Sequence, residues 1–484
     1  MEKPQTNVRN EKTVEQRAAV RELWLHFLWK SGRLNDCALI CTKGRSITVL
    51  SAGWYNRGWG PDFREAKILL GQDEYFGDIE IHVDESAWYG HGHHLDAAYN
   101  RVILHVFLHR GKTAAVNQLR QPLAGLHLGT LRQGTLEKTI PLHPASIEDV
   151  PGACGLRLGK KNVSKLKKFL MQASEQRLLQ KTELLERDLP NLGPKEQEDL
   201  LYTRICRSLG YSAHADLMTQ LSLHYPYSKL KPLFSTSHRQ VRVEVLSRWF
   251  GCGGILSSVD QNGLHDDMRR EWLAFRQFWQ NLSAEGIDAT HFPKQASRPL
   301  NRPARRLTGL FYHLEKTDFY GLFKSWLRFV VRCGKLIETE RKARRFLLSE
   351  LDAMFPQPDW EPFARLVDAG SCGKTSGPMK LIGRQRQLIV LVNAVIPFFL
   401  AWARLEDRKE IEKILFSLFL VLPPEGGNRK TKFMENRLAI KTNGILIRKN
   451  LSSHQGLIQF HEDCCRCFYQ GCGNCSLLKL LGEE

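Results

Sequence analysis

The stretch GWGPDFREAKILLGQDEYFGDIEIHVDESAWYGHGHHLDAAYNRVILHVFLH, residues 58–109, decides the fold of the N-terminal part of this 484-residue chain. Within it, GDIEIHV (77–83) alternates polar and apolar side chains with the period of a β-strand. Asp78, Glu80 and His82 therefore share one face of the strand, and the isoleucines between them point to the other face. The pattern predicts a strand with one apolar face and one face that carries two acids and a base.

A further acid, Asp62, lies in a tight Gly-Pro-Asp turn before this strand. Asp62 and Glu80 can each give an oxygen to Mg²⁺ or Mn²⁺, with the carbonyl of Ile81 as a third ligand. A metal so bound polarises water and neutralises charge on a phosphate, which is the chemistry of phosphodiester cleavage. His82 would orient or deprotonate that water, since imidazole titrates near neutral pH. The structural alternative is that Asp62 stabilises its turn and Glu80 forms an ion pair on the strand.

The surrounding pattern predicts an α+β protein in three parts. A helix over 13–30 precedes the expected strands, and together they form an α/β module over residues 1–150. Residues 156–450 show repeated amphipathic helical spacing, which predicts a basic, mostly α-helical domain, and residues 451–484 are rich in cysteine. The strands are expected at 46–54, 66–71, 77–83 and 101–108, and within 196–225 we expect two helices joined by a turn at Leu-Gly-Tyr (209–211).

Histidines are concentrated in the quoted stretch: six of the 17 in the chain lie within 28 residues. His91, His93 and His94 are candidates for catalysis or for contact with a phosphate, because imidazole binds metals and anions. They also support a zinc hydrolase as an alternative. His105 and His109 are expected in the core. Trp88 and Tyr99 are expected to be packing residues.

The cysteines at the C-terminal end predict a metal site. Five of the twelve lie between residues 464 and 475. Four of them form C-x₂-C-x₄-C-x₂-C, a spacing that suits tetrahedral Zn²⁺: Cys464, Cys467, Cys472 and Cys475. Alternatively, Cys465 with the last two gives C-x₆-C-x₂-C, a spacing that suits a 4Fe-4S cluster with one further ligand. Either centre would be structural, and ligation by thiolates favours a reducing cytoplasm.

The charge of the chain favours a polyanionic partner. There are 70 Lys and Arg against 51 Asp and Glu, a net charge of +19, and nucleic acid is the simplest partner for such an excess. In RPLNRPARRL (298–307) we expect Arg302, Arg305 and Arg306 to contact it, because a guanidinium binds two phosphate oxygens at once. The alternative is a solvated basic surface. Protein partners are possible but cannot be named.

No secretory signal opens the chain, and its most apolar run, residues 388–403, is short for a membrane span. This run also contains Asn393 and Pro397. We therefore expect a buried, kinked helix there, no contact with a membrane, and a cytoplasmic protein.

Long motifs of this chain resemble a bacterial family catalogued as domain of unknown function 2851, DUF2851. The likeness rests on the stretch from Gly60 to Val106 and on RPLNRPARRL, GRQRQLIVLVNAVIP (383–397) and HQGLIQFHEDCCRCFYQGCGNC (454–475). The N-terminal part is also similar to the PD-(D/E)XK nuclease superfamily, in which an acid before one strand pairs with Glu-x-Lys on the next.

On that similarity, Asp62 corresponds to the first acid and Glu80 to the second, while His82 stands where the superfamily has lysine. Glu22 is a candidate for the additional acid that the first helix of that superfamily often carries, and the alternative is an ordinary surface glutamate. Lys67, on the preceding strand, is a candidate to replace the lysine. The resemblance implies a metal-dependent nuclease that acts on DNA or RNA. The alternatives are a catalytically inactive nucleic-acid-binding or scaffold protein and the zinc-dependent hydrolase.

Overall fold

The computed structural model describes residues 22–30, 32, 34, 37–56, 60–131, 153–258, 266–282, 302–339, 343–359, 380–440, 443–445, 450–466 and 475–482. By contacts, the chain forms two compact units. The first comprises residues 1–170, 428–447 and 457–484, and the second comprises 171–427 and 448–456. The domain boundaries at residues 150, 156 and 451 remain predictions from the sequence.

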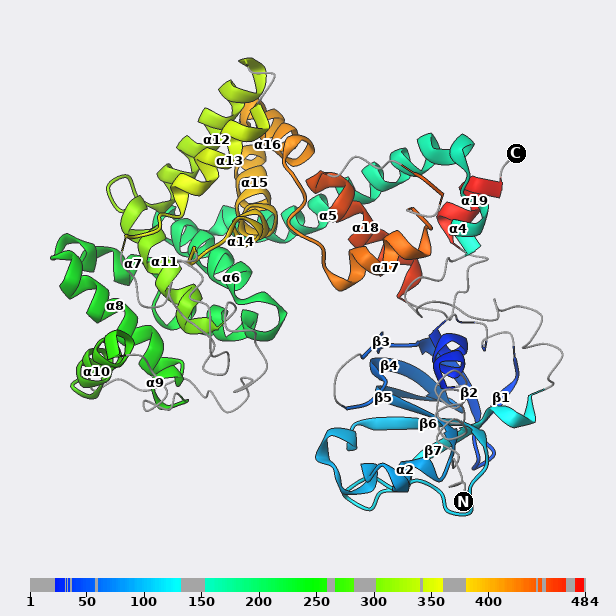
Figure 1. Cartoon of the computed structure of the whole chain (residues 1–484). Helices are drawn as coiled ribbons and strands as arrows, with labels where there is room; N and C mark the ends of the chain where they lie inside the picture. Colours follow the sequence, from blue (N-terminus) through cyan, green and yellow to red (C-terminus); the bar gives the residue numbers. More distant parts are fainter. Residues whose placement is uncertain are drawn as a thin grey trace, which may run out of the picture. The chain divides into compact units, whose positions relative to one another are not determined.

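The first unit contains a seven-stranded sheet in the order β1-β2-β4-β5-β6-β7, with β3 paired to β4 (Figure 1). Its strands are β1 (Leu39–Ile40), β2 (Ser46–Ser51), β3 (Trp54–Tyr55), β4 (Phe63–Leu70), β5 (Asp73–Asp84), β6 (Val102–His109) and β7 (Ala124–His127). From β1 to β5 the neighbouring strands are antiparallel, whereas β6 is parallel to β5 and β7 is parallel to β6. The four predicted strands are therefore confirmed.

Short helices make the parallel connection from β5 to β6. They are α2 (Ala87–Gly90), η2 (His93–Leu95) and η3 (Ala97–Tyr99), and η4 (Leu128–Thr130) follows β7. Residues 22–30 are helical, within the helix predicted over 13–30. This helix packs Leu25, Leu28 and Trp29 against the apolar side chains of the sheet, including Ile79 and Ile81 of β5.

The side chains on the other face of β5 are buried as well. Asp78, Glu80 and His82 are all less than one-tenth exposed, and Trp88 and Tyr99 form a second, smaller core with their neighbours. The sequence predicted one buried face for β5, and the structure buries both. The reason is that α2 and the turns before β6 cover the polar face.

A β-bulge shapes the start of β4. The register with β5 shifts between Phe63 and Ala66, and Glu65 adopts a left-handed backbone with φ of 59°. The N–H of Glu65 donates a 3.0 Å hydrogen bond to Oδ1 of Asp78, which stabilises the bulge. Gly53 lies against it, because a Cβ there would be 2.5 Å from the carbonyl oxygen of Arg64. Bulges of this kind redirect side chains beside functional sites.

The rest of the described chain is mostly helical, which confirms the α+β class. The helices from residue 153 to 282 are α4 (Ala153–Arg157), η6 (Lys160–Asn162), α5 (Val163–Asp188), η7 (Leu189–Asn191), α6 (Pro194–His224), α7 (Tyr227–Leu230), η8 (Lys231–Ser235), α8 (His238–Cys252), α9 (Ile255–Ser258) and α10 (Asp266–Gln280). Those that follow are α11 (Pro303–Thr317), α12 (Leu322–Thr339), α13 (Ala343–Met354), α14 (Arg384–Val390), η12 (Leu391–Val395), α15 (Ile396–Leu405), α16 (Lys409–Val421), α17 (Arg429–Arg437), α18 (Leu451–Phe460), η13 (His461–Cys465) and α19 (Ser476–Gly482).

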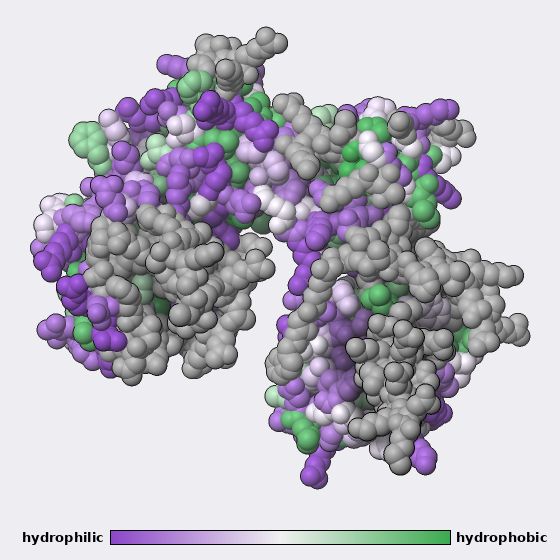
Figure 2. All heavy atoms as spheres, in the orientation of Figure 1, coloured by the Kyte–Doolittle hydropathy of each residue, from purple (hydrophilic) through white to green (hydrophobic). Residues whose placement is uncertain are grey.

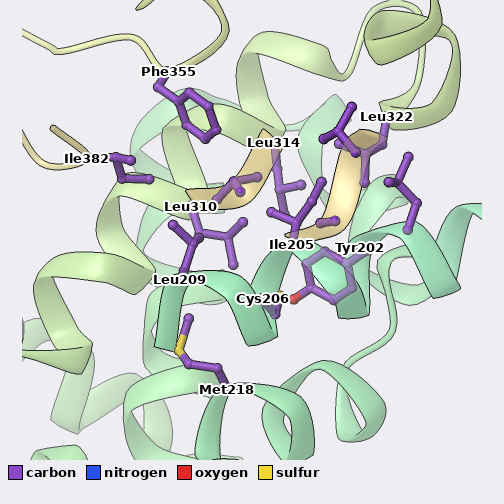
Figure 3. Packing of buried hydrophobic residues seen from close by; sticks show 14 of the residues in the cluster. Tyr202, Ile205, Cys206, Leu209, Met218, Leu310, Leu314, Leu322, Phe355 and Ile382 are labelled. Atoms are coloured by element: carbon purple, nitrogen blue, oxygen red, sulfur yellow. The ribbon is translucent and has the colours of Figure 1, made fainter. Parts of the chain in front are cut away.

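One expectation for these helices is wrong. The Leu-Gly-Tyr sequence at 209–211 predicts a turn between two helices, but α6 continues through it. A glycine inside a helix costs only about 1 kcal/mol. The buried side chains on either side, among them Leu209 and Met218, pack into the core of the second unit (Figure 3), and this burial outweighs the cost of Gly210.

The core of the second unit is built from large apolar side chains. Figure 3 shows Tyr202, Ile205 and Leu209 of α6 facing Leu310 and Leu314 of α11. On the face drawn in Figure 2, the described residues are mostly hydrophilic and the hydrophobic ones form smaller patches. The amphipathic spacing seen in the sequence thus separates a buried face from a solvated face.

The apolar run also lies in this core. By length and composition, the one described helix that could cross a membrane is Arg384–Leu405, and 72% of its apolar window is buried. A mostly buried core helix passes the same test, so this is weak evidence for a membrane span. The expected irregularity near Asn393 is present as a π-helix, Leu391–Val395. Such insertions bend helices.

Candidate functional site

Asp62 and Glu80 meet where the chain enters β4 beside β5. The backbone N–H of Asp62 donates a 3.0 Å hydrogen bond to Oε2 of Glu80. In the opposite direction, the N–H of Ile81 donates a 2.9 Å hydrogen bond to Oδ2 of Asp62. Each carboxylate is therefore bonded to the backbone of the segment that carries the other. Strand pairing brings the two predicted acids together.

Burial controls the charge of this pair. The side chain of Glu80 is 7% exposed and that of Asp62 is 21% exposed. Burial, and then the negative charge of Asp62, raise the pKa of Glu80 to about 9. The carboxyl of Glu80 therefore ionises near neutral pH only when a cation offsets the negative charge around it. The oxygens of the two carboxylates are the ligands that Mg²⁺ and Mn²⁺ prefer, so the pair fits such an ion.

The first helix adds two groups, one of which the sequence did not reveal. Nε2 of His26 lies 3.1 Å from Oδ2 of Asp62. Burial lowers the pKa of His26, but the carboxylates of Asp62 and Glu22 raise it, and the net shift is upward. For Glu22 the effect of burial has the opposite sign: burial raises the pKa of this carboxyl, and the nearby His26 offsets only part of the rise. The i, i+4 spacing of Glu22 and His26 was the available signal, since it places both on one side of the helix.

The histidines divide into a cluster and outliers. Nitrogen atoms of His82, His91 and His93 all lie within 4.8 Å of one another. His94 is directed elsewhere, with its ring 4.9 Å from the ring of Tyr89. Of the three candidate histidines His91, His93 and His94, the structure thus brings the first two together with His82.

His105 belongs to this neighbourhood, although we expected it only to pack in the core. It is fully buried, and its Nε2 lies 2.9 Å from Nδ1 of His82. Burial, and after it the charge of neighbouring histidines, lowers the pKa of His82 to about 2 and that of His105 to about 3. Both rings are therefore neutral at ordinary pH. His109 is exposed at the end of β6, so its assignment to the core was wrong.

Trp88 and Tyr99 are packing residues, as predicted, and they also fix His93. The rings of His93 and Tyr99 are stacked with centroids 3.9 Å apart, and Trp88 contacts the edge of His93 at 5.3 Å. Nε1 of Trp88 donates a 2.8 Å hydrogen bond to the carbonyl of Val116. The ring of His93 is thereby restrained on two sides.

Lys67 and Asp78 have structural roles and do not take part in the carboxylate site. Lys67 forms a 2.7 Å ion pair with Glu74, on the part of the β4–β5 hairpin away from Asp62. It therefore does not replace the missing lysine at the acids. Asp78 shares a face with Glu80, but it accepts the hydrogen bond from the bulge at Glu65.

The arginines of RPLNRPARRL are placed differently from the prediction. Arg302 is exposed, whereas Arg305 and Arg306 are buried. Arg305 donates a 2.6 Å hydrogen bond to the carbonyl of Lys380, and Arg306 donates one of 3.0 Å to the carbonyl of Leu381. These two guanidiniums serve the packing of α11, so of the three only Arg302 is available to a nucleic acid.

The structure places part of the cysteine cluster. Cys464 and Cys465 lie in η13 and Cys475 precedes α19, while Cys467 and Cys472 fall outside the described residues. The thiol of Cys464 interacts with that of Cys475 and lowers its pKa to about 6. Cys464 belongs to the first predicted C-x₂-C pair and Cys475 to the second, so the structure brings one cysteine of each pair into contact. The choice between Zn²⁺ and an iron–sulfur cluster stays open.

Fold and site together define a mixed α+β protein whose N-terminal sheet carries a buried cluster of carboxylates and histidines. The chain belongs to the DUF2851 family, because the model described as "Protein of unknown function (DUF2851)" matches residues 22–428. This confirms the resemblance seen in the sequence. No curated protein and no solved structure matches the chain.

Proposed function

We propose that this protein is a metal-dependent nuclease that hydrolyses phosphodiester bonds of DNA or RNA. The observation that carries the proposal is the reciprocal bonding of Asp62 and Glu80, which holds two carboxylates together in a position where a divalent cation would favour the ionised form of Glu80. Asp62 and Glu80 would bind Mg²⁺ or Mn²⁺, with Glu22 within electrostatic reach of Asp62. Such an ion lowers the pKa of bound water and offsets charge on a phosphate.

The arrangement of the sheet supports this proposal. Strands β2, β4 and β5 are consecutive antiparallel neighbours, and β6 returns parallel to β5 after a helical connection. The helix of residues 22–30 packs on the same sheet. This order of helix, three antiparallel strands, helical connection and parallel strand agrees with the nuclease resemblance of the sequence.

The residues around the acids have separate roles in the proposal. A histidine with a pKa of about 2 takes up no proton at neutral pH, so His82 is unsuited to the role of general base that we expected. Its neutral ring is a lone-pair donor. His91 is exposed beside His82 and His93, and can contact a phosphate of the substrate. The net charge of +19 would attract the polyanion, and binding should weaken steeply as salt rises.

Cleavage of labelled single- and double-stranded DNA and RNA in Mg²⁺ or Mn²⁺ tests the proposal. We expect the wild type to cut at least one substrate, and Glu80→Ala and Asp62→Asn to abolish the cut. Lys67→Ala is the matched control, since Lys67 is a charged residue of the same hairpin that pairs with Glu74. If neither the wild type nor the variants cut while all bind in a salt-dependent manner, the protein is a nucleic-acid-binding module and the catalytic proposal fails.

A further inference from the structure

The nitrogens of His82, His91 and His93 converge beside the proposed carboxylate site. They come from two segments, with His82 on β5 and the other two in the turn after α2. Gly92 makes this turn possible, because its backbone is left-handed with φ of 74°, a conformation that glycine adopts without strain. The turn at Gly92 brings the rings of both His91 and His93 next to that of His82, with centroids 5.1 Å and 5.3 Å away respectively.

Glu80 supplies a fourth donor atom. Its Oε1 lies 3.2 Å from Nε2 of His93 and 3.5 Å from Nε2 of His82. Within the described part of the chain, Nε2 of His93 has no hydrogen-bond partner, so its approach to Glu80 is close but not in hydrogen-bond geometry. For ligands about 2.0–2.1 Å from a tetrahedral ion, donor atoms are separated by roughly 3.3 Å. The distances from Glu80 to His93 and His82 match this separation, and the three imidazole nitrogens lie within 4.8 Å of one another.

We infer that His82, His91, His93 and Oε1 of Glu80 form a binding position for a transition-metal ion such as Zn²⁺, distinct in ligand chemistry from the Mg²⁺ or Mn²⁺ position at Asp62. Imidazole nitrogen suits Zn²⁺, Co²⁺ and Fe²⁺, whereas Mg²⁺ takes oxygen ligands. Glu80 belongs to both positions. Any role of this ion in phosphodiester cleavage therefore rests on the proposed function, whereas the binding of the ion does not.

His105 is a positioning residue for this site. Nε2 of His82 faces Glu80, and it can bind a metal only when it carries no proton. The ring proton must then sit on Nδ1, which lies 2.9 Å from Nε2 of His105 and can donate a hydrogen bond to it. In the proposed site, Nε2 of His105 accepts this hydrogen bond, and the contact then holds His82 in the tautomer that binds metal through Nε2. Tyr99 and Trp88 restrain the ring of His93 through ring contacts, by stacking on its face and by packing against its edge. The exposed position of His91 leaves one side of the site open to solvent.

Metal content of the full-length protein tests the inference. The wild type, stripped with chelator and reloaded with Zn²⁺, should contain one more equivalent by elemental analysis than either His91→Ala or His93→Asn. Loading with Co²⁺ should give the visible absorption of a nitrogen- and oxygen-bound ion, and the same variants should lose it. None of these substitutions changes a cysteine, so any metal at the predicted cysteine centre contributes equally to the zinc content of the wild type and the variants. His109→Asn, an exposed histidine of β6, is the control and should keep the wild-type content.

His91→Ala keeps the test decisive if a buried variant fails to fold, because His91 is exposed. His105→Gln should still bind the ion, with affinity about 10–100-fold lower. Equal zinc content in the wild type and His91→Ala overturns the inference. If the equivalent is lost as expected but no protein cleaves nucleic acid, the metal site stands and the nuclease proposal fails, which leaves a zinc hydrolase with another substrate.

Discussion

The backbone N–H of Asp62 donates a hydrogen bond to the carboxylate of Glu80, and the N–H that follows Glu80 in the chain returns one to Asp62. Each acid is thus fixed by the strand that carries its neighbour. The cost of this arrangement is electrostatic, because a buried carboxylate beside a second carboxylate resists ionisation. A site of this kind is at its least stable when it is both metal-free and charged.

Glu80 should make the metal-free protein less stable at alkaline pH. Its pKa in the folded state is raised to about 9 from an ordinary value of 4.5. The stabilising contribution is therefore complete below about pH 4.5 and is lost as pH rises through about 9. Between these limits, the difference in Tm between metal-free wild type and Glu80→Gln should move steadily in favour of the variant. A pH-independent difference would contradict the burial of this carboxylate.

Gly53 should tolerate alanine less well than Gly44. Both glycines have φ near +79°, so both variants carry the strain of a left-handed alanine, roughly 1–2 kcal/mol. Only at Gly53 would the new Cβ meet another atom, the carbonyl oxygen of Arg64 at 2.5 Å, whereas nothing lies within 4 Å at Gly44. The free energy of unfolding, measured by denaturant titration, should fall further for Gly53→Ala. Equal losses would show that the bulge shifts freely.

Arg305 and Arg302 should separate stability from nucleic-acid binding. Arg305→Ala removes a buried side chain and the donor to the Lys380 carbonyl, and should lower the free energy of unfolding by about 2–4 kcal/mol. Arg302→Ala changes an exposed residue and should leave stability within about 0.5 kcal/mol. If the predicted nucleic-acid contact exists, only Arg302→Ala weakens binding while the protein stays fully folded. Thermal unfolding and fluorescence anisotropy measure the two effects.

Cys464 and Cys475 should be required for the predicted C-terminal metal. Their thiols interact, and the pKa of Cys475 is lowered to about 6, which favours the thiolate that binds metal. Cys464→Ser and Cys475→Ser should reduce the zinc or iron content of purified protein and lower its Tm. Cys37→Ser, in the first unit but remote in sequence from the cluster, should do neither. Unchanged metal content in both cluster variants would exclude the predicted centre.

The sequence by itself determined the elements that depend on local periodicity. Alternation in GDIEIHV predicted β5 and the shared face of Glu80 and His82, because successive side chains of a strand point to opposite sides. Helical spacing predicted the mostly helical remainder. Local rules failed at Leu209–Tyr211, where packing on both sides outweighs the turn propensity of a single glycine.

Only the tertiary structure decided which side chains meet. The contact of His26 with Asp62, the selection of His91 and His93 but not His94, and the burial of Arg305 all depend on contacts between different elements of the fold. Periodicity fixes which way a side chain points relative to its own element, but it contains no information on what another element places opposite. That information comes from strand pairing, from the bulge in β4 and from the packing of helices, each of which satisfies contacts along the whole chain at once.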